Sequence, residues 1–264
     1  MYSRFDFIDA ARSTGNAFVD LVIAARNPEA PLIGAPAWNV TDCFGHVAST
    51  PSRFMGLVDG TVESCEHPQD LVDHNAKQIA NLATRDIGGL SDMLLEDLDV
   101  LLDTVAHFGA RVPNMDFDGV CPIRADAALG LLIGEFAIHG HDIAQATRQP
   151  WTIDPQLASL VAHGRHHILP RWVDPETAAG HTATYDVRLR SAERSIYEFT
   201  DGVLEVNPAD PRPADVHISV DPTTAMLAAY GRVSTRWACL TGRAFAWGPR
   251  PWLAAGFMKK FVPA

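Results

Sequence analysis

The chain has 264 residues, of which 47% are hydrophobic and 20% are charged. This composition can fill one large core or two ordinary ones, and it lies outside the range of disordered chains. The formal net charge is −11 and no Lys/Arg-rich run occurs, so nucleic acid is excluded as an expected partner.

The sequence also bears on the cellular compartment. Its four cysteines, Cys43, Cys65, Cys121 and Cys239, form no C-x-x-C motif and are widely scattered, which is typical of reduced thiols in a cytosol. No basic segment followed by an apolar one opens the chain, and no apolar run reaches the ~18 residues of a membrane span. We therefore expect a cytoplasmic protein with no membrane partner.

The first two thirds of the chain carry apolar residues at helical spacing, separated by proline and glycine clusters. The predicted helices cover residues 4–26, a segment from Asp42 onward capped by Thr41, 69–84, a segment capped by Ser91 or Asp92, 125–147 and 154–172. Gly88 and Gly89 are expected to break the third helix. Pro51 is expected to kink or end the second.

The pattern changes after about residue 175. TATYDVRLR and SIYEFT alternate apolar and polar residues, and VLEV and VHISV are further strand candidates. Asp201-Gly202 predicts a hairpin turn, Asp221-Pro222 opens a short helix, and PRPWLAAGFMKKF predicts a closing helix. We expect an α+β fold with two domains, residues 1–174 and 181–264.

The segment GEFAIHGHDIAQA carries the residues best suited to chemistry. On a helix, at about 100° per residue, Glu135, His139 and Asp142 fall within roughly 60° of one another. They border an apolar stripe of Leu129, Leu132, Phe136 and Ile143. His141 points to nearly the opposite side and is excluded. Polar groups at the edge of a core are costly unless they are paired or bind a metal.

A Glu and a His four residues apart can hold one ion between successive helical turns. The third ligand must come from another helix, and His46 is the candidate, on a face shared with Asp42, Thr50 and Arg53. Two His and one carboxylate leave coordination positions open, as in catalytic sites. Zinc is the first choice, although iron, nickel and manganese also suit this set. Asp142 would orient a ligand from behind.

The same spacing also has a plainer interpretation, because Glu-x-x-x-His pairs are common on helices without any metal. His163 and His167 repeat the spacing. They are flanked by Arg165 and Arg171, so they predict a solvated basic face instead.

Two segments resemble the signatures of the mycothiol-dependent maleylpyruvate isomerase family: PAWNVTDCFGHVA and GEFAIHGHDI. The segment ADVHISVDPTTAMLAAYGRVSTRWACLTGRAFAWG is similar to the small sterol-carrier-like domain that follows in that family. The resemblance implies an N-terminal DinB-like four-helix bundle of the up-down-down-up type with extra helices, followed by a small α+β sterol-carrier-like domain. It maps the family's metal ligands onto His46, Glu135 and His139.

The resemblance also implies a reaction. A divalent metal, zinc first, would lower the pKa of the thiol of mycothiol. The thiolate would add to a conjugated double bond of a small carboxylate-bearing substrate, and elimination after bond rotation would give the trans isomer; thiol transfer is the related outcome. Arg243, then Arg232, would hold the substrate as catalytic residues. Arg53 and Asp142 would serve cofactor binding, in a monomer or homodimer.

Two other functions stay open. The bundle could be a non-catalytic, zinc-stabilised regulatory or ligand-binding module of the anti-sigma kind, which a fourth protein ligand to the metal would favour. The C-terminal part could carry a lipid. However, its short strands, with Tyr185, Val187, Ile218 and Val220, predict an ordinary sheet core without a lipid tunnel.

Overall fold

The computed structural model describes residues 2–262, which form two compact units that divide after Ile153. The division lies earlier in the chain than the expected boundaries at 174 and 181. The reason is that the helix beginning at Leu157 packs against Pro222–Ala229 of the second unit. The first unit is helical and the second contains a sheet, so the predicted mixed α and β content is confirmed.

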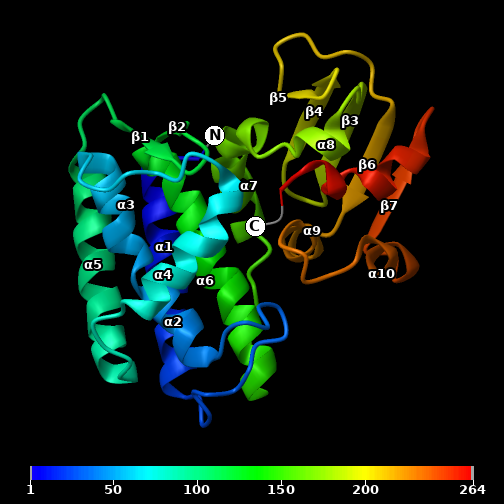
Figure 1. Ribbon diagram of the computed structural model, residues 1–264. Coiled ribbons are helices and arrows are strands. Elements are labelled where there is room, and N and C mark those ends of the chain that lie inside the picture. The colour runs from blue at the N-terminus through cyan, green and yellow to red at the C-terminus, as the bar shows by residue number, and fades with distance from the viewer. Residues whose placement is uncertain (1, 263–264) are drawn as a thin grey trace. The chain divides into compact units, whose positions relative to one another are not determined.

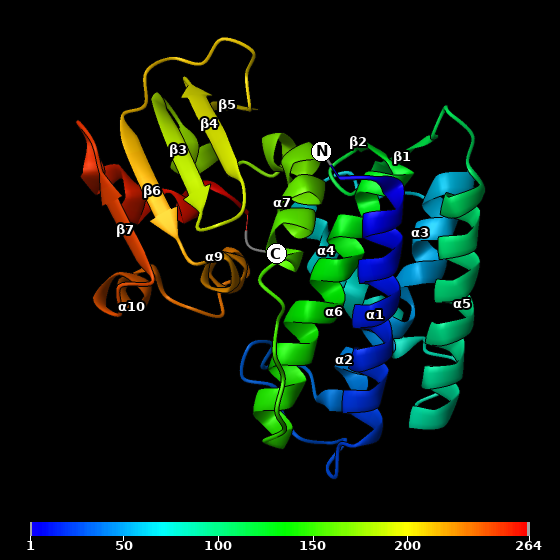
Figure 2. The ribbon, with the colours of Figure 1, turned by 180° about the vertical axis from the view of Figure 1, so that it is seen from behind.

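The first unit is built on long helices (Figures 1 and 2). Its elements are α1 (Arg4–Ile23), α2 (Val40–Ala48), α3 (Thr50–Asp59), a 3-10 turn η1 (Pro68–Asp70), α4 (Leu71–Ala80), α5 (Ile87–His107), β1 (Asn114–Phe117), β2 (Cys121–Arg124) and α6 (Ala125–Thr147). Helix α1 packs against both α5 and α6. Phe18 lies at the centre, with its ring centroid 5.9 Å from those of Phe44 and Phe136.

The helix ends correct two local predictions and confirm a third. Asn39, not Thr41, caps α2 through a reciprocal capping box with Asp42. The prediction for Pro51 is confirmed: α2 stops at Ala48, and Pro51 lies in the first turn of α3, where its missing N–H costs nothing. The prediction of a break at Gly88 and Gly89 is wrong, because Asp86 caps α5 by accepting a hydrogen bond from the Gly89 N–H.

The segment between α5 and α6 contains a short hairpin. Strands β1 and β2 pair antiparallel with Met115 opposite Ile123. The turn between them contains Gly119 and Val120, both with positive φ (83° and 51°). A non-glycine residue at positive φ is uncommon, and Val120 gives no sequence signal of it.

The second unit contains a five-stranded sheet with helices (Figures 1 and 2). Its elements are α7 (Leu157–Ile168), η2 (Leu169–Arg171), α8 (Pro175–Ala178), β3 (Ala183–Leu189), β4 (Arg194–Thr200), β5 (Val203–Val206), β6 (Val216–Val220), α9 (Pro222–Ala229), α10 (Thr235–Leu240), β7 (Ala244–Trp247), η3 (Pro251–Gly256) and η4 (Met258–Lys260). The strand order is β5-β4-β3-β6-β7, and only β3 and β6 are parallel.

The strand predictions in this unit are confirmed. The hairpin between β4 and β5 turns at Asp201 and Gly202, whose φ angles of 50° and 85° are the positive pair that a type I′ turn requires. The predicted closing helix is wrong: two short 3-10 helices, η3 and η4, take its place. Phe257 separates the two.

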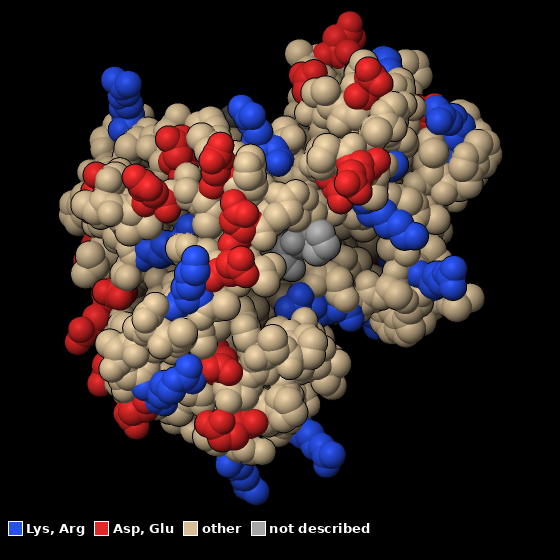
Figure 3. All heavy atoms as spheres, viewed as in Figure 1, with Lys and Arg blue, Asp and Glu red and all other residues tan. Residues whose placement is uncertain are grey.

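The charged side chains do not gather in a basic patch on the face that Figure 3 shows, as expected from a sequence without a Lys/Arg-rich run. On the face shown in Figure 3, acidic and basic side chains are interspersed. Within residues 2–262, no helix is both long and apolar enough to cross a membrane.

Candidate metal centre

Three metal-ligating side chains converge inside the first unit, one from α2 and two from α6. The Glu135 carboxylate Oε2 lies 3.2 Å from His139 Nε2 and 3.5 Å from His46 Nε2. All three donor atoms lie within 4.8 Å of one another, and no other such group occurs in the described part of the chain. The structure therefore brings together the three residues that the sequence singled out as ligands.

Helix geometry accounts for two of the three positions. Residues 135 and 139 are one turn apart on α6, so their side chains project from the same face. His46 reaches them because α2 packs against α6. His141 lies outside the donor group, and its Nε2 is 2.8 Å from Gln145 Nε2.

Each imidazole has an oxygen behind it. His46 Nδ1 lies 2.9 Å from Gln78 Oε1 on α4, so it can donate a proton to that amide oxygen. His139 Nδ1 faces the buried Asp142 carboxylate at 3.6 Å and is itself a buried atom without a hydrogen bond among the described residues. With the Nδ1 atoms turned toward oxygens, both Nε2 lone pairs are free to face Glu135.

Trp38 packs beside both rings. Its centroid lies 5.0 Å from that of His46 and 5.9 Å from that of His139. The two imidazoles stand edge to face, 5.5 Å apart. A fixed indole on one side limits how far either imidazole can rotate.

The pKa shifts of Glu135 and His139 indicate that the buried carboxylate needs a positive charge beside it. Burial by itself would raise the pKa of Glu135, but hydrogen bonds and charges from His139 and His46 hold it well below its usual range. Burial disfavours the charged form of His139, yet Cys43, Asp142 and Glu135 outweigh it and raise the imidazole pKa. Without another positive charge, a proton on an imidazole must balance the carboxylate. Two Nε2 atoms and one carboxylate oxygen at this spacing are a donor set that fits a divalent metal.

Arg53, expected to bind the cofactor, lies in a separate polar cluster. Its guanidinium forms two hydrogen bonds with the buried Asp118, of 2.7 and 3.0 Å, and its Nε donates to His74 Nε2 at 3.2 Å. The Cys65 N–H also donates to Asp118, at 2.8 Å. The guanidinium is thus held by a carboxylate of the protein, and its role toward a cofactor stays a prediction.

A polar pocket of about 340 Å³ adjoins this cluster. Arg53, His74, Lys77 and Gln78 contribute to its wall, together with Ser49, Ser52, Val62 and Asn81. Burial and the charge of Arg53 lower the pKa of His74. Gln78 also contacts His46, so one side chain of the pocket wall touches the metal-ligating group.

The two arginines expected to hold the substrate lie in the second unit. The Arg243 guanidinium is exposed, stacks over Trp237 at 5.3 Å and lies 3.8 Å from Asp221 Oδ1. Arg232 donates to the carbonyl oxygen of Tyr230 at 2.6 Å. Their role toward a site in the first unit stays a prediction, as does that of Asp142.

Sequence reasoning missed Gln78 and Trp38 beside the metal-ligating group and Asp118 in the Arg53 cluster. Trp38 carried a signal, since it lies in the PAWNVTD segment just before the capped helix. Gln78 and Asp118 carried none, because they contact their partners across 32 and 65 residues of sequence.

Comparison with known proteins gives two kinds of match. The family model described as "Mycothiol maleylpyruvate isomerase N-terminal domain" matches residues 9–144. A solved structure of a mycothiol-dependent maleylpyruvate isomerase superimposes with a TM-score of 0.57 and 16% identity, covering 95% of this chain and 96% of that one. A histidine-to-alanine variant of such an isomerase gives the same TM-score and coverage at 15% identity. No curated protein matches the chain in sequence.

Proposed function

The chain belongs to the mycothiol maleylpyruvate isomerase N-terminal domain family, and on that premise we propose that it is a metal-dependent, mycothiol-using enzyme. Its reaction is the cis–trans isomerisation of a small carboxylate-bearing substrate, or the related transfer of the thiol. The solved isomerase of the same fold, named for mycothiol and maleylpyruvate, supports the use of mycothiol and the isomerisation. We further propose the finer architecture, a DinB-like up-down-down-up bundle followed by a sterol-carrier-like domain.

The observation that carries the proposal is the convergence of His46, Glu135 and His139. Only these three donors gather in the described part of the chain, and three protein ligands leave positions for a thiol or water. A purely structural zinc site is normally closed by a fourth protein ligand. This difference favours an enzyme over the alternative of a zinc-stabilised regulatory module.

The residues have distinct parts in the proposed mechanism. His46, Glu135 and His139 would hold the metal, and Gln78 and Asp142 would fix the two imidazoles through Nδ1. When bound, the metal stabilises a thiolate at neutral pH, which is the nucleophile that addition to a conjugated double bond needs.

Arginines would bind the other reactants. Arg243, or second Arg232, would pair with the substrate carboxylate, for which a planar guanidinium fork is suited. Arg53 contributes a positive charge to the polar pocket beside Gln78, where the hydroxyl-rich part of a thiol such as mycothiol would find hydrogen-bond partners.

A thermal-shift titration of the zinc-loaded protein with mycothiol tests the proposal. A ligand that binds the native state raises Tm in proportion to the logarithm of its concentration over Kd. We expect a rise of about 3 °C or more at 100 Kd for mycothiol, and a much smaller rise at the same concentration for its S-methyl derivative, which cannot form a thiolate.

The variants separate the parts of this proposal. His46→Ala should abolish the mycothiol response, while His141→Ala, on the same helix as Glu135 and His139 but outside the donor group, should keep it. If millimolar mycothiol does not raise the Tm of the zinc-loaded protein, the assignment of mycothiol as the thiol is refuted. The assignment of the metal centre is unaffected by that result.

A further inference from the structure

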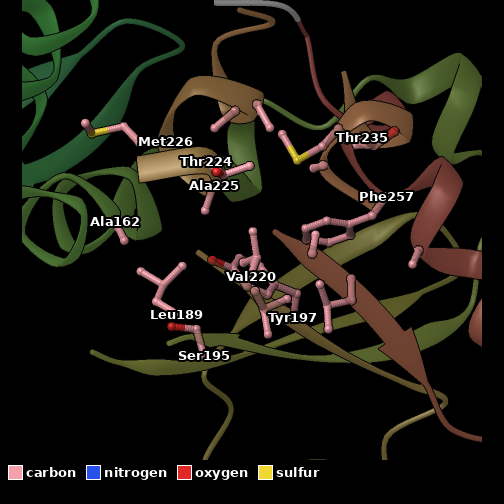
Figure 4. A pocket seen from close by; sticks show the side chains of 18 of the residues that line it. Ala162, Leu189, Ser195, Tyr197, Val220, Thr224, Ala225, Met226, Thr235 and Phe257 are labelled. Carbon is pink, nitrogen blue, oxygen red and sulfur yellow. The ribbon is translucent and has the colours of Figure 1, made fainter. Parts of the chain in front are cut away.

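The second unit encloses a cavity of about 580 Å³ between the sheet and the helices α7, α9 and α10 (Figure 4). Its wall is mainly apolar, with Val187, Leu189, Ile218, Val220, Met226 and Phe257 among the lining side chains. A volume of this size is ordinary for small-molecule sites. The expectation of an ordinary filled sheet core is therefore wrong, because three of its named residues, Val187, Ile218 and Val220, line this space.

Two arginines line this wall, and only Arg165 is buried, because Arg236 on α10 is exposed. Arg165 on α7 lines the cavity and is only 8% exposed. Its guanidinium stacks on the Tyr230 ring at 4.7 Å, and no carboxylate among residues 2–262 pairs with it. Stacking occupies the face of the guanidinium and leaves the N–H donors at its edge available. A buried cation without a counter-ion is costly, so this group calls for an anion.

Two pairs of polar side chains in the wall are hydrogen-bonded to each other. His166 Nε2 lies 2.9 Å from the Tyr197 hydroxyl. Glu193 accepts a hydrogen bond of 3.4 Å from Ser195, and burial raises its pKa. Neither pair involves the guanidinium, so Arg165 is the group that a ligand would have to satisfy.

We propose that this cavity binds an amphipathic carboxylic acid. Its carboxylate pairs with the edge of Arg165, and its apolar body lies against the sheet residues Ile218 and Val220 and against Met226 and Phe257. All lining residues belong to the second unit, so the site stands on its own and does not rest on the proposed metal-dependent reaction.

Fluorescence titration of the full chain with 11-(dansylamino)undecanoic acid, followed by displacement with decanoic acid or 1-decanol, tests the proposal. The two competitors share a chain and differ in charge. We expect one saturable site, with decanoate displacing the probe at about tenfold lower concentration than decanol. No saturable binding, or equal displacement by both, would overturn the proposal.

Variants then locate the site. Arg165→Met should weaken decanoate binding about tenfold and leave decanol unchanged, because only the charged pairing is lost. Arg165→Lys should keep part of the preference, and the exposed Arg171→Met is the matched control. Unchanged decanoate affinity in Arg165→Met would contradict the assignment.

A cavity-filling variant shows whether a loss of binding comes from the blocked cavity or from misfolding. Ala225→Trp, from α9, should remove binding of both competitors while Tm stays at or above that of the parent (Figure 4). His46→Ala should bind the probe normally, which separates this site from the metal centre. If the Ala225→Trp protein is folded and still binds the probe, the probe's binding site lies outside this cavity and the proposal is wrong.

Discussion

Each imidazole of the candidate metal centre has an oxygen behind its ring, and these oxygens favour the ring orientation in which Nε2 faces Glu135. Gln78 Oε1 accepts from His46 Nδ1 at 2.9 Å, and Asp142 faces His139 Nδ1 at 3.6 Å. Such supporting residues set the affinity of the site as well as its geometry. The carboxamide of Gln78 is the simpler of the two to test, because it carries no charge.

Gln78→Leu should lower zinc affinity by about tenfold, since His46 loses the acceptor that fixes its tautomer. Competition with a chromophoric chelator measures this, with Gln145→Leu, an exposed glutamine on α6, as the control. Equal affinities for the two variants would mean that Gln78 does not orient His46.

His166 makes stability depend on pH. Burial lowers its pKa from 6.5 to about 4 in the folded chain. Between these values the unfolded chain binds a proton that the folded chain rejects, so stability is full above pH 6.5 and falls as the pH falls toward 4. His166→Gln should remove about 2 kcal/mol of the loss between pH 7 and pH 5.

Urea unfolding at the two pH values measures this difference. His167→Gln, an exposed neighbour on the same helix, should retain the full loss. A His166→Gln protein with the same pH dependence as the parent would show that His166 is not held neutral by burial.

At the scale of elements, the ion pair between Arg53 and Asp118 fastens α3 to the turn between β1 and β2. Asp118 is 1% exposed, and the Arg53 side chain is 12% exposed. Breaking a buried pair from one side leaves an uncompensated charge. Asp118→Ala should therefore destabilise the protein by about 3 kcal/mol in urea unfolding.

The matched control is Asp99→Ala. It removes the partner of Arg12 in a pair whose side chains are 62% and 41% exposed. Exposed pairs contribute at most about 1 kcal/mol. Similar losses in the two variants would contradict the structural role given to Asp118.

Single helices and hairpins could be predicted from the sequence. Helix α6 spans the predicted residues 125–147, because its apolar pattern is strong and Pro150 follows it, so the relation of Glu135 to His139 followed from helix geometry alone. The β4–β5 hairpin followed from Asp201-Gly202. Contacts between distant elements did not follow: His46 depended on a family resemblance, and Gln78 was missed.

At the scale of the whole molecule, the chain combines a helical unit that carries the metal-ligating group with a sheet unit that carries the candidate substrate arginines. The cavity in the second unit was not predictable from strand alternation. An apolar sheet face has the same sequence pattern whether side chains fill the space above it or leave it open.

The proposed reaction makes a prediction that spans both units. Arg243→Gln should lower kcat/KM for mycothiol-dependent isomerisation of maleylpyruvate by about 100-fold, because a charged contact to the substrate carboxylate is lost. Zinc content should not change. Arg171→Gln is the control, and a fall in activity no larger than in that control would remove Arg243 from the mechanism.

The central claim is that His46, Glu135 and His139 bind one divalent metal ion, and metal analysis of the purified, zinc-equilibrated protein tests it most directly. We predict about one equivalent of metal per chain in the parent and in His141→Ala, and less than about 0.2 equivalents in His46→Ala and His139→Ala. A parent protein below about 0.2 equivalents, or a metal content unchanged by His46→Ala, would contradict the claim.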